Sequence, residues 1–322
     1  MSTSRPALLW VLAYSVCSTA MLLANKAALN TYPLPLALTC VQLIFAATVT
    51  LPLVLRGGFT RTSAKSLSLY VFEGILFAAS ISLNLKALSM TNVGMMVIAR
   101  SCLPIVVYLL ELLLGSAGGL SFRSTVSLVC VVAFSSLYAL DAQGVKMNHI
   151  GLVYVAAWLL ILACQMIYGK WLIAAVQLRH WERVFYTNGC GLPVLTILAH
   201  HETKLLFAEF SSDTVSNTIL LLTCVAGVAI GYTSWRVRSL VSATTFSLVG
   251  VLNKMGTICL AFLLWPSEGS YLSFVALVGC LGSGMLYEGN KPAGRQQTRR
   301  DDDGDDDRGE SAKVVKSYRL RS

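Results

Sequence analysis

The sequence predicts an all-α, polytopic membrane protein of about ten transmembrane helices. Of its 322 residues, 55% are hydrophobic and only 13% are charged, whereas a soluble domain carries roughly 25% charged residues. A helix needs about 20 largely apolar residues to cross the hydrocarbon core, so the chain has room for roughly ten crossings joined by short loops. No separate soluble domain is expected.

Windows of about 19 residues place the spans in order along the chain. They are expected at 7–29, 35–55, 67–89, 93–114, 122–140, 150–170, 184–200, 216–235, 240–264 and 271–287. Turn or charge signals such as Arg56-Gly57-Gly58 separate most of them. The first span is too long for the apolar region of a signal peptide and lacks a clear cleavage site, so we expect it to remain as an anchor.

The basic residues predict the orientation, because Lys and Arg in short loops are retained on the cytoplasmic side. With a cytoplasmic N-terminus, the opposite loops hold only Lys146 and Lys204. The cytoplasmic side and its span ends hold Arg5, Arg56, Arg61, Lys65, Arg123, Lys170, Arg179, Arg183, Arg236 and Arg238. An even number of spans returns the C-terminus to the same side.

The chain changes character at its end. We expect one transmembrane domain over 1–289, followed at 290–322 by a disordered, charged cytoplasmic tail that lacks the apolar residues to pack. The aspartates within 301–307 could suggest a metal site, but a solvated block of charge is the more common meaning of such a run.

The two halves of the membrane part resemble each other. Thr91 is followed nine positions later by Arg100, and Thr245 is followed nine positions later by Lys254, with both basic residues inside predicted spans. A weaker similarity between the two halves relates Asn25-Lys26 to Gly169-Lys170. Five spans per half is an odd number, so the pattern predicts two inverted five-helix repeats over about 7–140 and 150–287.

Cysteines, histidines and net charge do not indicate metal, cofactor or nucleic-acid chemistry. The nine cysteines fall within predicted spans without a CxxC motif, as small buried residues do. The four histidines lie in or beside loops without an HxxxH pair. The net charge of +9 is spread over membrane-flanking loops and the tail, which argues against a nucleic-acid surface.

Lys254 and Arg100 are the strongest candidates for a binding site. A Lys or Arg at the bilayer centre costs roughly 2.5–3.5 kcal/mol on insertion scales, so each is expected to face a cavity, a partner or a ligand. Two such charges suit a ligand with about two negative charges, such as a nucleotide diphosphate sugar. The alternative is pairing with Glu73 or Glu111; Glu111 is roughly 16 Å from Arg100 along one helix and cannot reach it.

A second candidate is the stretch Phe185-Tyr186-Thr187-Asn188, which opens the seventh span. Aromatic rings and an amide could stack on and read a base, although aromatic residues at a membrane interface are commonly belt anchors. Helix packing and cavity lining are equal alternatives for Tyr14, Ser18, Thr233 and Ser234.

The remaining polar residues of the spans have simpler expected roles. Asn25 and Asn84 are expected to form hydrogen bonds between helices. Lys26 and Lys86 lie near span ends, where long basic side chains extend to the interface.

The stretches FYTN at 185–188 and TTFSLVGVLNK at 244–254 together resemble signatures of the nucleotide-sugar transporters of the drug/metabolite transporter superfamily, and above all those of the GDP-mannose branch, usually written FYNN and GALNK. Arg100 followed by Glu111, Tyr168-Gly169-Lys170 and Asn25-Lys26 are further parallels. The likeness covers nearly the whole membrane part and stops at the tail.

The resemblance implies a Golgi carrier that exchanges a cytosolic nucleotide sugar, such as GDP-mannose, for lumenal GMP. Its partners would be these two nucleotides and membrane lipids; a homodimer is left open. In the family the asparagines of the first signature contact guanine. Here Asn188 matches the second asparagine, and Thr187 replaces the first.

The second signature is matched more fully. In the family its glycine and the next residue approach the nucleotide and sugar, and its lysine serves the phosphates. Gly250, Asn253 and Lys254 match, whereas Val251 replaces an alanine. Phe246 stands where the family often has a tyrosine, and Tyr14 keeps the tyrosine usual in the first span. The differences leave the base and sugar open.

Two alternatives remain. Within the same superfamily, the chain could carry a UDP-sugar or exchange organic phosphates. In a different class, it could be a membrane-embedded enzyme that modifies sugars or lipids. Such chemistry needs carboxylates or histidines gathered at a membrane face, but the spans supply only Glu73 and Glu111, with Asp141 at a span end. We therefore expect a transporter rather than an enzyme.

Overall fold

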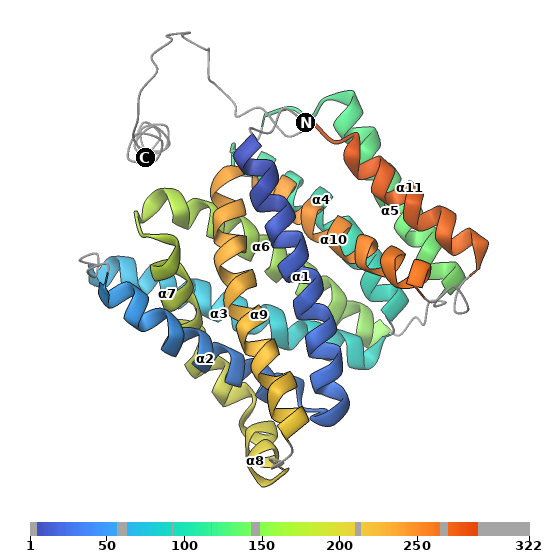
Figure 1. Ribbon diagram of the computed structural model, residues 1–322. Helices are drawn as coiled ribbons and strands as arrows, with labels where there is room; N and C mark the ends of the chain where they lie inside the picture. Colours follow the sequence, from blue (N-terminus) through green and yellow to red (C-terminus); the bar gives the residue numbers. More distant parts are fainter. Residues whose placement is uncertain are drawn as a thin grey trace.

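The computed structural model describes residues 5–56, 63–91, 93–116, 118–142, 149–209, 214–264 and 270–288, and the regular elements within these ranges are all helices (Figure 1). In chain order they are α1 (Arg5–Thr31), α2 (Pro35–Arg56), α3 (Ala64–Met90), α4 (Val93–Leu113), α5 (Phe122–Ala142), α6 (His149–Ala175), α7 (His180–Leu198), α8 (His200–Glu209), α9 (Thr214–Leu240), α10 (Ala243–Leu264) and α11 (Tyr271–Met285).

Each predicted span coincides with a helix, and the largest shift of a boundary is five residues, at the ends of α6 and α9. The short helix α8 was not predicted. Within the described ranges, seven helices are long and apolar enough to cross a membrane, and α11 is a shorter apolar helix. This confirms a polytopic, all-α membrane protein, while the count of ten spans stays a prediction. The predicted tail at 290–322 lies outside the described residues.

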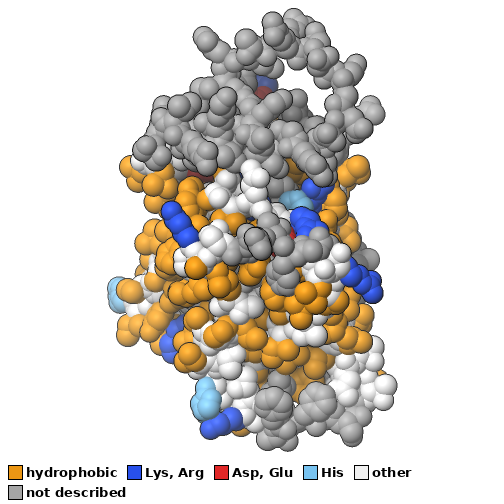
Figure 2. Space-filling model, turned by 90° about the vertical axis from the view of Figure 1, so that its left-hand side faces the viewer, with side chains coloured by type: hydrophobic (Ala, Val, Ile, Leu, Met, Phe, Trp, Pro, Cys, Tyr) orange, Lys and Arg blue, Asp and Glu red, His pale blue; other side chains and the backbone are white. Residues whose placement is uncertain are grey.

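The outer surface of the helix bundle is apolar. Leu9, Val16, Leu113, Val153 and Ile197 are among many large hydrophobic side chains that are more than half exposed. Figure 2 shows hydrophobic side chains over most of the described surface on one face. An apolar patch of this extent would be a liability in water, whereas lipid accommodates it.

One end of the bundle, which we call the basic end, is the end at which α1 begins. Its basic residues include Arg123, Lys170, Arg179, Arg183 and Arg236. At this end the Arg236 guanidinium lies 5.1 Å from the ring centroid of Trp10, so α9 ends where α1 begins. Lys170 Nζ donates to the carbonyl of Arg238 at 2.9 Å and joins the ends of α6 and α9.

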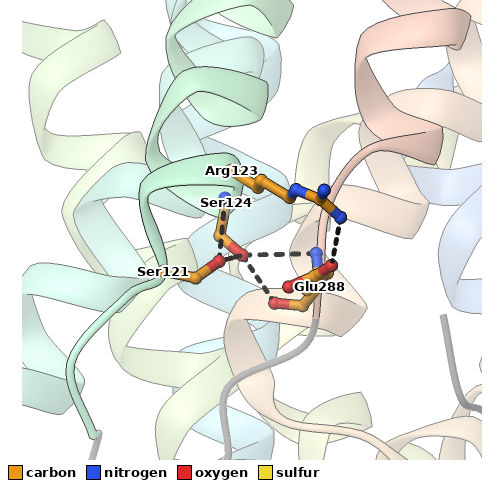
Figure 3. A network of polar contacts seen from close by, with 4 residues as sticks. All are labelled: Ser121, Arg123, Ser124 and Glu288. Atoms are coloured by element: carbon orange, nitrogen blue, oxygen red, sulfur yellow. Dashed lines mark hydrogen bonds and ion pairs between the residues drawn. The ribbon is translucent and has the colours of Figure 1, made fainter.

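The end of α11 belongs to the basic end as well. Ser124 Oγ, on the first turn of α5, donates to the carbonyl of Glu288 at 2.7 Å, and Arg123 pairs with the Glu288 carboxylate at 3.3 Å (Figure 3). At the opposite end, the Glu202 carboxylate accepts hydrogen bonds from the backbone N–H groups of Leu36 and Ala37 at 2.8 and 3.2 Å. Glu202 thus links α8 to the first turn of α2, whose N–H groups have no partner within the helix.

The helix pairing is similar in the two halves. Helix α1 packs against α9 as α6 packs against α3, and α4 packs against α5 as α10 packs against α11. Pairs α2 with α7, α4 with α10, and α5 with α11 join the halves. Two related five-helix halves would produce this pattern; the inverted repeat itself stays a prediction. The crossing of α3 on α7 needs a glycine, because a Cβ on Gly74 would lie 2.6 Å from the backbone nitrogen of Gly191.

Candidate functional site

A cavity of about 490 Å³ lies in the middle of the bundle, within the usual range for small-molecule sites. Its walls come from α1, α2, α3, α4, α6, α7, α9 and α10. The wall begins on the basic side at Glu73, Arg238 and Phe246, and it extends to Leu29 and Pro35 at the opposite end. The cavity is therefore displaced toward the end away from the basic residues.

The structure brings part of the predicted site to this cavity. The predicted site residues that line it are Tyr14, Arg100, Thr187, Asn188 and Ser234. Asn25 and Asn84 line it too. Asn25 also confirms its predicted packing role, because its Oδ1 accepts a hydrogen bond from Gln42 Nε2 at 2.9 Å across α1 and α2.

Arg100 projects from α4 toward α10. A Cβ on Gly250 would lie 3.9 Å from Arg100 Nη2, so the guanidinium rests against the glycine of the second signature. Lys254 follows Gly250 by four residues on α10, so the two lie on the same helix face, which is the face that Arg100 approaches. Lys254 does not itself line the cavity. Arg100 thus lies at the cavity wall, and Lys254 lies behind it on α10.

Carboxylates do not neutralise these two cations within the part of the chain that the structure describes. The pairing suggested as the alternative is not formed. Glu73 pairs with Arg238 at 3.6 Å, and Glu111 accepts a hydrogen bond from Thr244 Oγ1. Arg100 Nε is also buried without a hydrogen-bond partner among these residues, so the site holds an unused donor.

The first signature is split between the cavity and the helix core. Thr187 Oγ1 is buried at the cavity wall and has no partner in the described ranges. Asn188 also lines the cavity, with Nδ2 donating to the carbonyl of Val184 at 2.7 Å. Tyr186 instead packs against Tyr70 of α3, with ring centroids 5.5 Å apart, and Phe185 packs against Tyr186. Neither aromatic ring lines the cavity.

The second signature also contains residues that hold helices together. Asn253 Oδ1 accepts a hydrogen bond from Ser15 at 2.6 Å, while Asn253 Nδ2 is buried without a partner among the described residues. Val251 is buried in a core cluster that includes Leu128 of α5 and Cys280 of α11. The structure therefore places Asn253 at the α1–α10 contact and Val251 away from the cavity.

Three further residues shape the basic side of the cavity. The rings of Tyr14 and Phe246 lie 5.4 Å apart and join α1 to α10. Ser234 donates to the carbonyl of Gly231 within α9 at 2.9 Å. Thr233 similarly donates to Ala229 within its helix at 2.8 Å, and it and Ser18 do not line the cavity.

Lys26 and Lys86 are exposed outside the cavity, in agreement with the interface role predicted for them.

Arg238 is the main cavity residue that the sequence did not identify. It was assigned to a membrane-flanking segment, because the eighth span was expected to end at 235, whereas α9 continues to Leu240. Gly231, Ser234 and Arg238 follow the i, i+3, i+7 spacing of one helix face, and all three line the cavity. The helical spacing between Ser234, already a candidate, and Arg238 is the sequence signal that could have identified Arg238 as a cavity residue.

Several named proteins are similar to this chain over most of its length. GDP-fucose transporter 1 of Arabidopsis thaliana is 26% identical over 293 residues, which cover 86% of this chain and 84% of that protein. GDP-mannose transporter GONST3 of the same plant is 26% identical over 309 residues, with 92% and 82% covered. Its UDP-galactose/UDP-glucose transporter 7 is 25% identical over 304 residues, with 88% and 90% covered.

Structural comparison supports the fold alone. A solved crystal structure matches with a TM-score of 0.65 at 14% sequence identity, covering 88% of this chain and 96% of that chain. No family model matches the sequence. The sequence relatives thus carry the functional comparison.

Proposed function

Because the chain is related over most of its length to transporters of nucleotide sugars, we propose that it carries a GDP-sugar, GDP-mannose or a close relative, into the Golgi lumen in exchange for GMP. The observation that carries the proposal is the pair Arg100 and Lys254, two adjacent cations without a carboxylate partner among the described residues. The relatives are named as transporters and not as enzymes, and we assign no catalytic role to any residue.

The two cations suit a nucleotide phosphate. Like charges that lie together in a low-dielectric site repel each other, and an anion between or beside them removes that repulsion. Hydrogen bonds from cations to phosphate are roughly twice as strong as those between neutral groups. Arg100 lines the cavity and has an unused donor, Nε, so it would contact the phosphate directly, with Lys254 adding charge behind it.

The opposite wall suits the base. Thr187 and Asn188 lie side by side on α7 and both line the cavity, and Thr187 Oγ1 has no partner among the described residues. We assign the base to this wall, with the hydroxyl and the amide as hydrogen-bonding groups. A hydroxyl cannot present the paired donor and acceptor of an amide, so discrimination between bases would be weaker than with two asparagines.

The proposed transport cycle is alternating access, with the two five-helix halves rocking about the central site. In the orientation that the basic residues predict, the basic end is cytoplasmic and the cavity reaches toward the lumen. Labelling of N- and C-terminal tags in sealed vesicles tests this orientation; both tags should be accessible from the cytoplasmic side, and a lumenal tag would contradict it.

A competition assay tests the substrate. The full-length protein is reconstituted into liposomes loaded with GMP, and uptake of radiolabelled GDP-mannose is measured with GDP-fucose, UDP-galactose or UDP-glucose as competitors. Both GDP-sugars should inhibit more strongly than the UDP-sugars. If no guanine nucleotide inhibits and a UDP-sugar does, the second candidate, a UDP-sugar carrier, replaces the first. Thr187 in place of an asparagine and the similarity to a UDP-sugar transporter favour that candidate.

A further inference from the structure

Glu73 and Arg238 form a buried ion pair at the basic-side limit of the cavity. The carboxylate and the guanidinium are 3.6 Å apart, with side-chain exposures of 1% and 13%. Glu73 lies in the early part of α3 and Arg238 in the last turn of α9. Gln165 Nε2 on α6 donates to the same Glu73 oxygen at 3.5 Å. The pair therefore ties α3, α6 and α9 together where the cavity ends.

Aromatic rings hold the guanidinium in this position. Arg238 Cζ lies 4.8 Å from the ring centroid of Phe246 on α10 and 5.2 Å from that of Trp235. Gly169 on α6 leaves room for the guanidinium, since a Cβ there would lie 2.6 Å from Arg238 Nη1. The Arg238 side chain of α9 thus contacts α3, α6 and α10, and its release would remove this link between them at the basic end.

The pair is incompletely satisfied. Glu73 Oε2 and Arg238 Nε are buried without hydrogen-bond partners in the described ranges. Removing two charges from water is repaid only when the remaining polar atoms are also bonded. A pair with this deficit is poorly suited to a purely structural role, whereas it can be exchanged for a better partner.

A better partner can reach Arg238 from the cavity. Arg238 and Arg100 line the same cavity, and the Tyr14 ring, which also lines it, packs on the Phe246 ring that the Arg238 guanidinium contacts. An anion that occupies the phosphate site beside Arg100 would therefore also attract Arg238. The guanidinium could then exchange a carboxylate for a phosphate without passing through an unpaired buried state.

We propose that the Glu73–Arg238 ion pair is a ligand-exchangeable latch that closes the basic end of the empty carrier and opens when a bound anion takes Glu73's place. The inference rests on the proposed function only for the identity of the anion. It explains why the protein would exchange substrates, because the empty carrier stays latched and cannot return unloaded.

The latch can be tested without any ligand, by measuring how fast a cysteine in the cavity is labelled from the basic end. Ser80, which lines the cavity, is replaced by cysteine, and the full-length protein is reconstituted in vesicles sorted so that the basic end faces outward. A membrane-impermeant maleimide is then added, and labelling of the same protein with Ser80 intact is subtracted for the native cysteines. With the latch closed, the reporter should be protected; adding Glu73→Gln should speed its labelling at least roughly tenfold, as the loss of one charged hydrogen bond implies.

Two comparison variants keep the test decisive. Glu111→Gln alters another buried carboxylate of the basic end, which bonds to Thr244 and does not line the cavity, and it should leave the reporter protected. The double variant Glu73→Gln with Arg238→Gln avoids an unpaired buried charge, so it should fold as stably as the parent and still label quickly. Protection in both Glu73 variants, or equal labelling in Glu111→Gln, would overturn the latch.

The same labelling assay with nucleotides added separates this inference from the proposed function. GMP or GDP-mannose should increase labelling of the parent reporter and have little further effect on Glu73→Gln. If uracil nucleotides alone have this effect, the GDP assignment fails and the latch stands. If Glu73→Gln opens the basic end but neither guanine nor uracil nucleotides change the parent, exchange of Arg238 onto the ligand is wrong.

Discussion

Two arginines at the same cavity have opposite surroundings. Arg238 is paired with Glu73 and held between aromatic rings, whereas Arg100 lies beside a second cation, Lys254, and has no carboxylate partner among the described residues. A cation that is neutralised within the protein can hold helices together. A cluster of cations that is not neutralised is unfavourable until an anion binds. The comparison separates the residues that we propose to close the carrier from those that we propose to bind its ligand.

Loss of a partner at the neutralised site should have the largest effect on stability. Glu73→Gln leaves the Arg238 guanidinium buried without its carboxylate, and breaking a buried pair in this way costs about 3–5 kcal/mol. The free energy of unfolding in detergent, measured by denaturant titration, should fall by about this amount. Glu111→Gln, the matched variant, should cost only about 1 kcal/mol, because it weakens a single hydrogen bond. Equal losses would contradict the distinct role of Glu73.

Loss of a charge at the other site should affect transport and not stability. Lys254→Ala should reduce exchange by roughly tenfold or more, because the loss of one of two cations weakens the electrostatic attraction of the phosphate by about 1.4 kcal/mol or more. The ligand-free variant should be at least as stable as the parent, since removing Lys254 relieves its repulsion with Arg100. Lys26→Ala, at an exposed lysine outside the cavity, is the control and should exchange normally. Unchanged uptake by Lys254→Ala would refute the assignment.

A smaller loss of stability is expected when the Arg238 guanidinium is displaced but keeps Glu73 as its partner. In Gly169→Ala the new methyl group would meet Arg238 Nη1 at 2.6 Å, and the displacement should cost about 1–2 kcal/mol of stability. Gly282→Ala on α11 provides the control, since a Cβ there has no neighbour within 4 Å among the described residues. Thermal unfolding compares the two, and equal midpoints would mean that Arg238 is free to move aside.

The smallest expected effect is a change in the preference between guanine and uracil nucleotide sugars. Thr187→Asn restores an amide at the cavity wall, where it can offer a paired donor and acceptor. The ratio of inhibition by GDP-fucose to inhibition by UDP-galactose should rise by less than about tenfold, the value of roughly one hydrogen bond. A fall in this ratio would place the base elsewhere. Tyr186→Phe, at a residue that does not line the cavity, should leave the ratio unchanged.

The sequence predicted the helices well because crossing a membrane imposes a length and a composition on each span. The sequence also predicted Arg100 and Lys254 as binding residues, since a charged residue is conspicuous in an apolar run; their role in binding stays a prediction. It could not predict the partner of Glu73, because α9 extends beyond its apolar part and carries Arg238 back into the bundle. Which residues of FYTN and of the second signature face the cavity depends on the rotation of each helix about its axis. Nearly uniform hydrophobicity does not reveal this rotation, so the sequence could not show that Val251, Phe185 and Tyr186 lie away from the cavity.

Binding of GMP and guanosine, measured on the purified protein by the shift in unfolding temperature, tests the central claim most directly. The two ligands share a base and ribose and differ in the phosphate. If Arg100 holds the phosphate and Lys254 adds charge behind it, the parent should bind GMP much more tightly than guanosine, and Lys254→Ala should lose part of this preference. A variant without Lys254 that keeps the full preference for GMP would contradict the account.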